Sequence, residues 1–320
     1  MKVCIQIPCY NEEEHLGQTA RDLPQYLSGI DAIEVVVIDD GSVDRTAAVA
    51  RTSGAHVVTI PVNRGLANAF VTGIHACLAR GADIIVSTDA DNQYCGSDVA
   101  RLVVPILSGD ADLVIGARPI AEIDSFSPLK KLLQHVGSWV IRMLTGTMVA
   151  DATSGFRAMS RDTALQVNVF SRYTYTLETI VQAANRGLRI ASVPIGVNAT
   201  ARRSRLVRSN LNYLWRTGSD LIRVFVVYRP FRSFMVPALV LFIIATGIAL
   251  RFLYYLFESD GVGHVQSLIL AAILYGISGA LMAVAFVGDL LAINRRLLEE
   301  FQLDARRRKF GNCKQGLGDG

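Results

Sequence analysis

The sequence predicts an α/β protein in which a mainly parallel sheet carries helices on both faces and is followed by amphipathic juxtamembrane helices and two transmembrane helices. Two observations lead to this fold class. Short runs rich in β-branched residues alternate with helix-length segments over residues 1–200, an order typical of parallel sheets. Two long apolar runs without charges follow beyond residue 232, and runs of this kind predict helices that cross a bilayer.

The predicted strands come first along the chain. They are the runs at residues 3–7, 35–38, 56–60, 84–88 and 113–115. Helix-length segments such as residues 65–80 separate them. In parallel α/β sheets, ligands bind beyond the carboxyl ends of the strands. The polar clusters at residues 8–13, 39–44 and 89–93 each follow a predicted strand, so we expect the functional site there.

The apolar runs predict two membrane spans. Residues 233–250 form a run of 18 residues without a charge, which residues 252–257 extend beyond Arg251. Residues 267–288 form a second run, of 22 residues. At about 1.5 Å per residue, each run with its flanks can cross a hydrocarbon core about 30 Å thick. Buried helices of soluble proteins are usually shorter, so we expect spans rather than core helices.

Flanking charges predict how the chain lies in the membrane. Arginines precede the first run and follow the second, whereas the loop at residues 258–266 contains Glu258 and Asp260 but no Lys or Arg. By the positive-inside rule, both termini and the N-terminal domain face the cytoplasm. The apolar run at residues 3–7 is too short for a signal peptide. We therefore expect an integral protein of a bacterial inner or plasma membrane.

Composition narrows the classes of partner. The chain carries 32 basic and 28 acidic residues, a formal net charge of +4. The basic residues gather beside the predicted spans, which favours anionic lipid headgroups over nucleic acid. The five cysteines include no Cys-x-x-Cys pair, a pattern that suits reduced thiols and argues against a disulfide framework or structural zinc.

The chain divides into four predicted segments. They are a cytoplasmic α/β domain at residues 1–200, a basic amphipathic juxtamembrane segment at 201–231, a two-helix transmembrane domain at 232–296 and a cytoplasmic tail at 297–320. In the juxtamembrane segment, arginines are interleaved with Leu, Tyr and Trp, which is typical of a helix at the membrane interface. The alternative is an ordinary solvated helix face.

The sharpest polar cluster predicts a metal site. Asp89 and Asp91 come directly after the apolar strand at residues 84–88, with Gln93 two residues further on. Two carboxylates and an amide are hard oxygen ligands that suit Mg²⁺ or Mn²⁺ bound to a diphosphate. An isolated Asp-x-Asp also occurs in solvated turns, but its place after a strand of an alternating pattern favours a functional role.

Two further clusters suit a nucleotide. Asp39, Asp40 and Ser42 follow the second predicted strand, where acidic acceptors can hold ribose hydroxyls or a base edge. Helix capping is the alternative for such residues, and Asp44 is the candidate for that role. After the first strand, Tyr10 can lie on a base, and Glu12 can accept its N–H donors.

Five ordered motifs together resemble the family 2 glycosyltransferases of GT-A fold. They are Ile7-Pro8-Cys9-Tyr10-Asn11-Glu12, Val37-Ile38-Asp39-Asp40-Gly41-Ser42 with Asp44, Asn63-Arg64-Gly65, Asp89-Ala90-Asp91, and Asp151-Ala152-Thr153-Ser154-Gly155-Phe156-Arg157. With two C-terminal spans, the chain is most similar to the polyprenyl-phosphate branch, which includes dolichol-phosphate mannosyltransferases and bacterial undecaprenyl-phosphate glucosyltransferases. The resemblance extends to about Arg296.

The resemblance implies inverting transfer of a sugar from a UDP- or GDP-sugar to a polyprenyl phosphate, undecaprenyl or dolichyl, at the cytoplasmic membrane face. Pro8, Tyr10, Asn11, Glu12, Asp39, Asp40 and Ser42 would bind the nucleotide, and Asp89, Asp91 and Gln93 the Mg²⁺ or Mn²⁺. Arg118, Arg202, Arg203 and Arg205 would bind the acceptor phosphate, with Asp89, Asp91 and Arg118 at the catalytic centre. Relatives with two spans imply a homo-oligomer, a tetramer.

Other roles stay open at this point. Glu178 occupies the place where relatives with hydroxyl acceptors carry an acidic base motif, but a phosphate monoester, with a second pKa of about 6, needs no strong base. A processive polysaccharide synthase is one alternative, although the Gln-x-x-Arg-Trp motif of such enzymes is absent from the sequence. A non-catalytic membrane scaffold of the same fold is the other, and it would have no need of a metal site.

Overall fold

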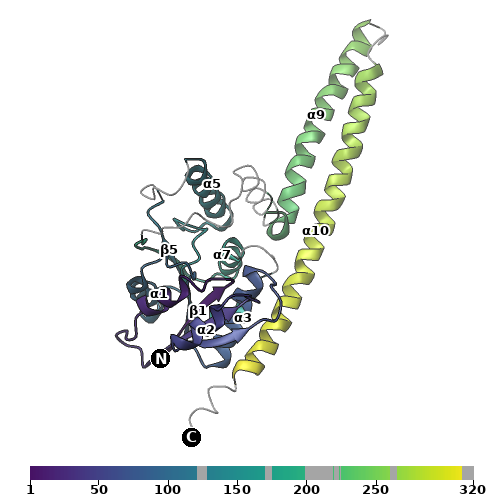
Figure 1. Cartoon of the computed structure of the whole chain (residues 1–320). Coiled ribbons are helices and arrows are strands. Elements are labelled where there is room, and N and C mark those ends of the chain that lie inside the picture. Colours follow the sequence, from purple (N-terminus) through teal and green to yellow (C-terminus); the bar gives the residue numbers. More distant parts are fainter. Residues whose placement is uncertain are drawn as a thin grey trace. The chain divides into compact units, whose positions relative to one another are not determined.

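We analysed a computed structural model of the whole chain (Figure 1). It describes residues 1–120, 128–169, 175–198, 219, 223, 225–259 and 265–311. The chain forms two compact units. The first comprises Met1–Ser219 together with Phe301–Gly320, and the second comprises Asp220–Glu300.

The first unit is built on a seven-stranded sheet. Its strands are β1 (Lys2–Cys9), β2 (Ala32–Asp39), β3 (His56–Thr59), β4 (Ile84–Ser87), β5 (Leu113–Ala117), β6 (Arg157–Ser160) and β7 (Ile190–Pro194). They lie in the order β3-β2-β1-β4-β6-β5-β7. Strand β6 runs antiparallel to both neighbours, and the other pairs are parallel. The predicted mainly parallel α/β class is therefore confirmed.

Helices follow most of the strands, as the alternation in the sequence predicts. They are α1 (Leu16–Asp22), α2 (Thr46–Thr52), α3 (Leu66–Ala79), the 3₁₀ helix Gly96–Asp98, α4 (Val99–Leu107), α5 (Pro128–Thr145), α6 (Arg161–Gln166) and α7 (Thr176–Asn185). The helix predicted at residues 65–80 corresponds to α3. All five predicted strands are present, with ends shifted by up to three residues.

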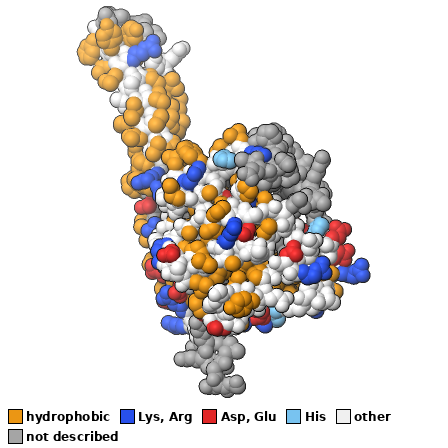
Figure 2. Space-filling model, turned by 90° about the vertical axis from the view of Figure 1, so that its left-hand side faces the viewer, with side chains coloured by type: hydrophobic (Ala, Val, Ile, Leu, Met, Phe, Trp, Pro, Cys, Tyr) orange, Lys and Arg blue, Asp and Glu red, His pale blue; other side chains and the backbone are white. Residues whose placement is uncertain are grey.

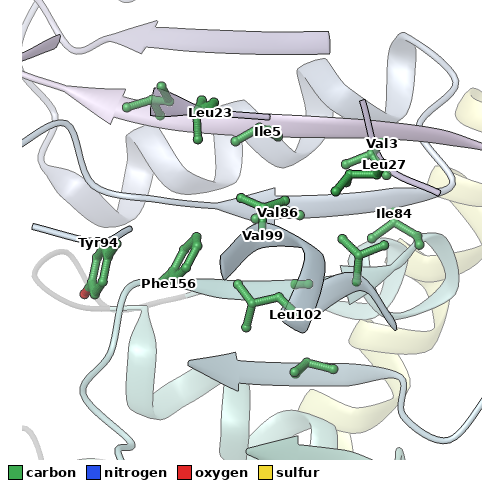
Figure 3. Close-up of a cluster of buried hydrophobic side chains, with 14 of the residues drawn as sticks. Val3, Ile5, Leu23, Leu27, Ile84, Val86, Tyr94, Val99, Leu102 and Phe156 are labelled. Atoms are coloured by element: carbon green, nitrogen blue, oxygen red, sulfur yellow. The ribbon is translucent and has the colours of Figure 1, made fainter. Parts of the chain in front are cut away.

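The apolar strands and their helices form a dry core. Val3 and Ile5 of β1, Val86 of β4 and Leu102 of α4 are fully buried in one cluster (Figure 3). Strands buried on both faces have continuous apolar sequences, which is why the central strands can be predicted from the sequence. The same cluster contains Tyr94, so the hydrophobic core extends to the segment that follows Asp89 and Asp91.

Two strands, β6 and β7, lack the sequence pattern that predicts the other strands. Strand β6 has the sequence Arg-Ala-Met-Ser, which lacks both the apolar run and the β-branched residues that mark the others. Strand β7 is only partly buried, at the edge of the sheet beside β5. Both are defined by their hydrogen-bonding partners rather than by their own composition.

The second unit contains the two long apolar helices, α9 (Pro230–Ser259) and most of α10 (Val265–Gly311). Pro230–Phe257 and Val265–Gly311 are long and apolar enough to cross a membrane, with mean hydropathies of 2.4 and 2.3. The Ser278 hydroxyl donates to the Ala238 carbonyl at 2.8 Å, and the Thr246 and Tyr275 hydroxyls are 2.9 Å apart. Figure 2 shows that hydrophobic side chains predominate on the surface of this helical pair.

Part of the segment predicted as a tail, residues 297–320, is helical. Helix α10 continues to Gly311, and its end, residues 301–311, belongs to the first unit. Arg306 donates to the carbonyls of Leu165 and Val167 at 3.1 and 2.6 Å, where α6 ends. Arg161 donates to the Phe310 carbonyl at 2.7 Å, and the Phe310 ring lies 5.8 Å from that of His75. This end of α10 therefore packs on α3 and α6.

Candidate active site

The predicted site residues gather where β1, β2 and β4 end. Cys9 of β1 pairs with Asp39 of β2, and Gln6 of β1 pairs with Ser87 of β4. The three strands are parallel, so their following loops leave the same edge of the sheet. Asn11 and Asn92, in two of these loops, both have a left-handed backbone with φ of 55°, a conformation that Asn tolerates better than most residues.

The Asp-x-Asp pair lies on the loop after β4. Asp89 is partly buried, whereas Asp91 is exposed and accepts a hydrogen bond from the backbone N–H of Gln93 at 3.1 Å. Burial, followed by the charge of Asp91, raises the pKa of Asp89 to about 6. Two carboxylates that repel each other in this way favour the binding of a cation between them.

Two arginine side chains also act on the carboxyl group of Asp89. The cation of Arg118 lowers the pKa of Asp89, and that of buried Arg157 does so more weakly. Arg118, which follows β5, is thus near enough to the Asp-x-Asp loop to influence Asp89, and its role at the site stays a prediction. Gln93 is partly buried two residues beyond Asp91.

The loops after β1 and β2 hold each other in place. The Ser42 hydroxyl accepts from the backbone N–H of Asn11, and the Asn11 side chain accepts from the N–H of Val43, both at 2.9 Å. Pro8 is buried within β1, whereas Tyr10 is 44% exposed. Its ring is therefore available to lie against a base.

The acidic residues after β2 bind backbone amides. Asp40 accepts from the N–H groups of Arg64 and Gly65 at 3.0 and 2.8 Å, just before α3 begins. Asp39 accepts from the N–H of Ser42 at 3.0 Å. Asp44 accepts from the N–H of Thr46, the first residue of α2, at 2.9 Å, so it does help to cap that helix. Nucleotide contacts of Asp39 and Asp40 stay predictions.

Close packing joins this loop to the Asn63-Arg64-Gly65 motif. Gly41 has φ of 73°, and a Cβ there would meet the backbone nitrogen of Asn63 at 2.7 Å. A side chain at position 41 would push these two loops apart. Two motifs that are more than 20 residues apart in the sequence thus form one surface.

Arg118 is held in a buried ion pair. Its guanidinium donates to both carboxylate oxygens of Asp151, at 2.7 and 3.2 Å, and to the Thr153 hydroxyl at 2.9 Å. The side chains of Arg118 and Asp151 are 7% and 1% exposed. The fork geometry that would suit an acceptor phosphate is thus occupied by a carboxylate from the motif at residues 151–157.

Some predicted residues lie elsewhere. Arg202, Arg203 and Arg205 are outside the described residues. Glu178 is in the first turn of α7 and is 5% exposed. Roles for all four stay predictions.

The structure adds residues to which sequence reasoning gave no role. Asp151 pairs with Arg118, Gly155 lies against Asp89, and the Tyr94 hydroxyl accepts from the Gly155 N–H. Asp151 and Gly155 belong to a motif that was recognised without a function, and Tyr94 is a buried aromatic residue next to Gln93. That adjacency was the one available signal for Tyr94.

Comparisons with known proteins agree with this geometry. The profile of glycosyl transferase family 2 matches residues 4–166, just over half of the chain. Undecaprenyl-phosphate mannosyltransferase of Micrococcus luteus is 32% identical over 61% of this chain and 83% of its own length. UDP-N-acetylglucosamine–dolichyl-phosphate N-acetylglucosaminyltransferase of Methanococcus voltae is 30% identical over 59% of this chain and 82% of its own length.

A solved structure shows the same fold. Glucosyl-3-phosphoglycerate synthase of Mycobacterium tuberculosis, crystallised with Mn²⁺, uridine diphosphate and glucosyl-3-phosphoglycerate, aligns with a TM-score of 0.55 and 25% identity. The alignment covers 70% of this chain and 78% of that one. The family profile, the relatives and the GT-A arrangement of the sheet lead to one conclusion: the chain belongs to glycosyltransferase family 2 and is a glycosyltransferase.

Proposed function

We propose that this protein transfers a sugar from a UDP- or GDP-sugar to a polyprenyl phosphate at the cytoplasmic face of a membrane, giving a polyprenyl-phosphate-linked monosaccharide. The observation that carries the proposal is that one segment contacts both Asp89 and Arg118: Asp151 binds the Arg118 guanidinium, and the Gly155 backbone lies against the Asp89 carboxylate. Asp89 suits a metal ion bound to the donor's diphosphate, and Arg118 suits the acceptor phosphate. The names of the two polyprenyl-phosphate relatives support this acceptor.

The residues present fit a divalent metal ion completed by substrate. Among the described residues, no three His, Cys, Asp or Glu side chains are grouped to hold an ion alone. Mg²⁺ is usually bound by one or two carboxylates together with substrate phosphates. Asp89, Asp91 and Gln93 would hold Mg²⁺ or Mn²⁺ in that way, and the bound ion would offset negative charge on the leaving diphosphate.

The chain's own residues would orient the two substrates. The exposed ring of Tyr10 would cover the base, and the oxygens of the loops after β1 and β2 would contact the ribose. Arg118 would exchange part of its bond with Asp151 for the acceptor phosphate, because guanidinium forks bind either anion. Arg202, Arg203 and Arg205 are proposed as further phosphate contacts.

The reaction needs little help from a base. A phosphate oxygen of the acceptor would bond to the anomeric carbon while the bond from that carbon to the donor's diphosphate breaks, with inversion. The acceptor monoester has a second pKa of about 6 and is largely ionised at neutral pH, so no proton has to be removed. This chemistry leaves Glu178 an orienting or structural role.

A product assay tests the proposal. Purified full-length protein in detergent would be incubated with Mn²⁺, a panel of UDP- and GDP-sugars and undecaprenyl or dolichyl phosphate, and the lipid weighed by mass spectrometry. We expect one sugar added per lipid with a single preferred donor. A polysaccharide product would identify a processive synthase instead. Failure of every donor, together with no metal-dependent nucleotide binding, would identify a scaffold.

A further inference from the structure

The surroundings of Asp89 are set by β6, the antiparallel strand. Ser87 at the end of β4 pairs with Arg157 at the start of β6. Continuing this antiparallel register by two residues places Gly155 opposite Asp89. The turn before β6 thus faces the metal-binding loop, although about 65 residues separate them in the sequence.

Gly155 lies directly against the Asp89 carboxylate. A Cβ built on Gly155 would be 2.8 and 2.9 Å from the two carboxylate oxygens of Asp89. Real Cβ atoms are essentially never so close to other heavy atoms. Only a residue without a side chain leaves Asp89 its present position, so this backbone forms one wall of the carboxylate's site.

Tyr94 forms a second wall and is oriented by the first. Its ring is 4% exposed and stacks on Phe156, with centroids 5.0 Å apart (Figure 3). The hydroxyl accepts a hydrogen bond from the Gly155 N–H at 3.1 Å, and its interaction with Asp89 lowers the pKa of that carboxyl. A tyrosine hydroxyl has one proton. Because the Gly155 N–H donates to the hydroxyl oxygen, the hydroxyl proton is left to be donated to Asp89.

We propose that Tyr94 is the positioning residue for the metal-binding carboxylate of Asp89, with the Gly155 N–H fixing the direction of its hydroxyl. The inference rests on the proposed metal role of Asp89. Partners that hydrogen-bond a metal-binding side chain fix its orientation, and their loss typically weakens metal affinity about 10- to 100-fold. Here, the bond from Tyr94 holds one carboxylate oxygen and the contact with Gly155 limits rotation, so the carboxylate meets the ion already oriented.

Tyr175 provides a matched comparison on the other side of Gly155. It is also buried, and its ring stacks on Phe70 with centroids 3.7 Å apart. Its hydroxyl donates to the Gly155 carbonyl at 3.4 Å. Tyr175 thus resembles Tyr94 in burial and stacking, but its hydroxyl bonds to the Gly155 carbonyl rather than to Asp89.

The test measures Mn²⁺ affinity of the full-length protein in detergent at pH 7.5, by electron paramagnetic resonance with saturating UDP. We expect Tyr94→Phe to weaken Mn²⁺ binding about 10- to 100-fold and Tyr175→Phe to weaken it less than about threefold. The thermal unfolding midpoint without metal serves as a second readout. A purely structural role for Tyr94 would lower that midpoint while leaving Mn²⁺ affinity unchanged well below it, which would overturn the inference.

Two further results separate the possible failures. If the wild-type protein binds no Mn²⁺ even with UDP, the metal role of Asp89 fails and the inference fails with it. If the wild type binds Mn²⁺ and Tyr94→Phe binds it equally well, the positioning role alone is wrong. Should Tyr94→Phe not fold, Gly155→Ala keeps the hydroxyl but adds a methyl group against Asp89, and normal Mn²⁺ affinity in that variant would likewise contradict the inference.

Discussion

At the scale of single residues, the site combines an exposed carboxylate with a shielded one. Asp91 faces solvent, whereas Asp89 lies against Gly155 and Tyr94 and has its pKa raised by burial to about 6. Asp89 would ionise more easily if residue 91 were neutral. Repulsion between the two carboxylates therefore costs free energy unless a cation offsets it. This cost is typical of functional rather than structural carboxylates.

Asp91→Asn should therefore abolish catalysis without affecting folding. The change keeps the side-chain oxygen that accepts from the Gln93 N–H, but it removes one of the two charges that attract the metal. We expect sugar transfer to fall about 100-fold or more, measured with the preferred donor in detergent. Membrane insertion and the thermal unfolding midpoint should match the wild type, since exposed substitutions usually change stability by less than about 0.5 kcal/mol. Unchanged turnover would remove the metal assignment.

Arg118 calls for a different design, because it is bound to Asp151. Removing one partner of a buried ion pair typically costs about 3–5 kcal/mol of stability. We expect Arg118→Ala and Asp151→Ala each to lower the thermal unfolding midpoint, and the double variant to lower it by less than the sum. Additive shifts would show that the pair is not coupled.

The role of Arg118 in acceptor binding is better tested with lysine. Arg118→Lys keeps the charge but loses the two-pronged fork. We expect it to raise the KM for polyprenyl phosphate while donor hydrolysis in the absence of lipid stays near the wild-type rate. An equal fall in both activities would contradict the proposed contact with the acceptor.

At the scale of elements, the end of α10 is a distinct part of the first unit. Residues 301–311 pack on α3 and α6 through Arg306, Phe310 and His75. Burial, together with the charges of Arg306 and Lys309, lowers the pKa of His75 to about 4. The free imidazole has a pKa of about 6.5, so His75 takes up a proton at mildly acidic pH when the helix end is detached and does not when it is packed.

Packing of the α10 end should therefore weaken on acidification. The stabilisation is fully present above pH of about 6.5 and is lost progressively as the pH falls towards about 4, because the detached state binds more protons. Hydrogen exchange of residues 301–311, corrected for intrinsic rates, should be faster at pH 5 than at pH 7. His75→Gln should lose this difference, whereas His56→Gln, at an exposed position, should retain it. A pH effect that survives in His75→Gln would have another source.

Helix α5 is the other element with an unusual surface. Leu132, Val136, Trp139 and Met143 recur at three- and four-residue spacing and are 59, 43, 55 and 68% exposed. An apolar stripe of this kind, in a protein with two candidate spans, is typical of a helix that lies at a membrane surface.

Trp139 makes this surface measurable. The chain has two tryptophans, so Trp215→Phe leaves Trp139 as the single indole. In vesicles that contain brominated lipids, we expect its fluorescence to be quenched and its emission to be blue-shifted relative to an indole in water. Emission typical of a fully hydrated indole, without quenching, would show that α5 faces the solvent.

At the scale of the whole molecule, the two long helices and their flanking charges predict a topology with both termini in the cytoplasm. In intact cells, Ser259→Cys at the last residue of α9, next to the segment that joins the spans, should react with a membrane-impermeant maleimide, in a background with Cys95 and Cys313 replaced by serine. In a separate variant with only Cys95 replaced by serine, native Cys313 should react after permeabilisation and not before. The reverse pattern would place the catalytic domain outside the membrane and contradict the use of cytoplasmic nucleotide sugars.

The parts of this protein that the sequence predicted are those set by local pattern. The first five strands, helix α3 and the two long apolar helices are predictable from the sequence, because continuous apolar runs and uncharged stretches reflect burial or lipid directly. The Asp-x-Asp pair was found for the same reason, since its position just after an apolar strand is itself a local feature. Strands β6 and β7 were missed because their short, mixed sequences carry no such pattern.

The sequence by itself determined the class of the fold, the membrane-spanning length of two helices and the chemical types at the site. The tertiary structure alone decided which of these groups meet. It pairs Arg118 with Asp151, 33 positions away, and places Gly155 and Tyr94 against Asp89 through the antiparallel strand β6. Hydrophobic periodicity records whether a residue is buried, whereas contacts between distant residues depend on strand order and register, which no single segment encodes.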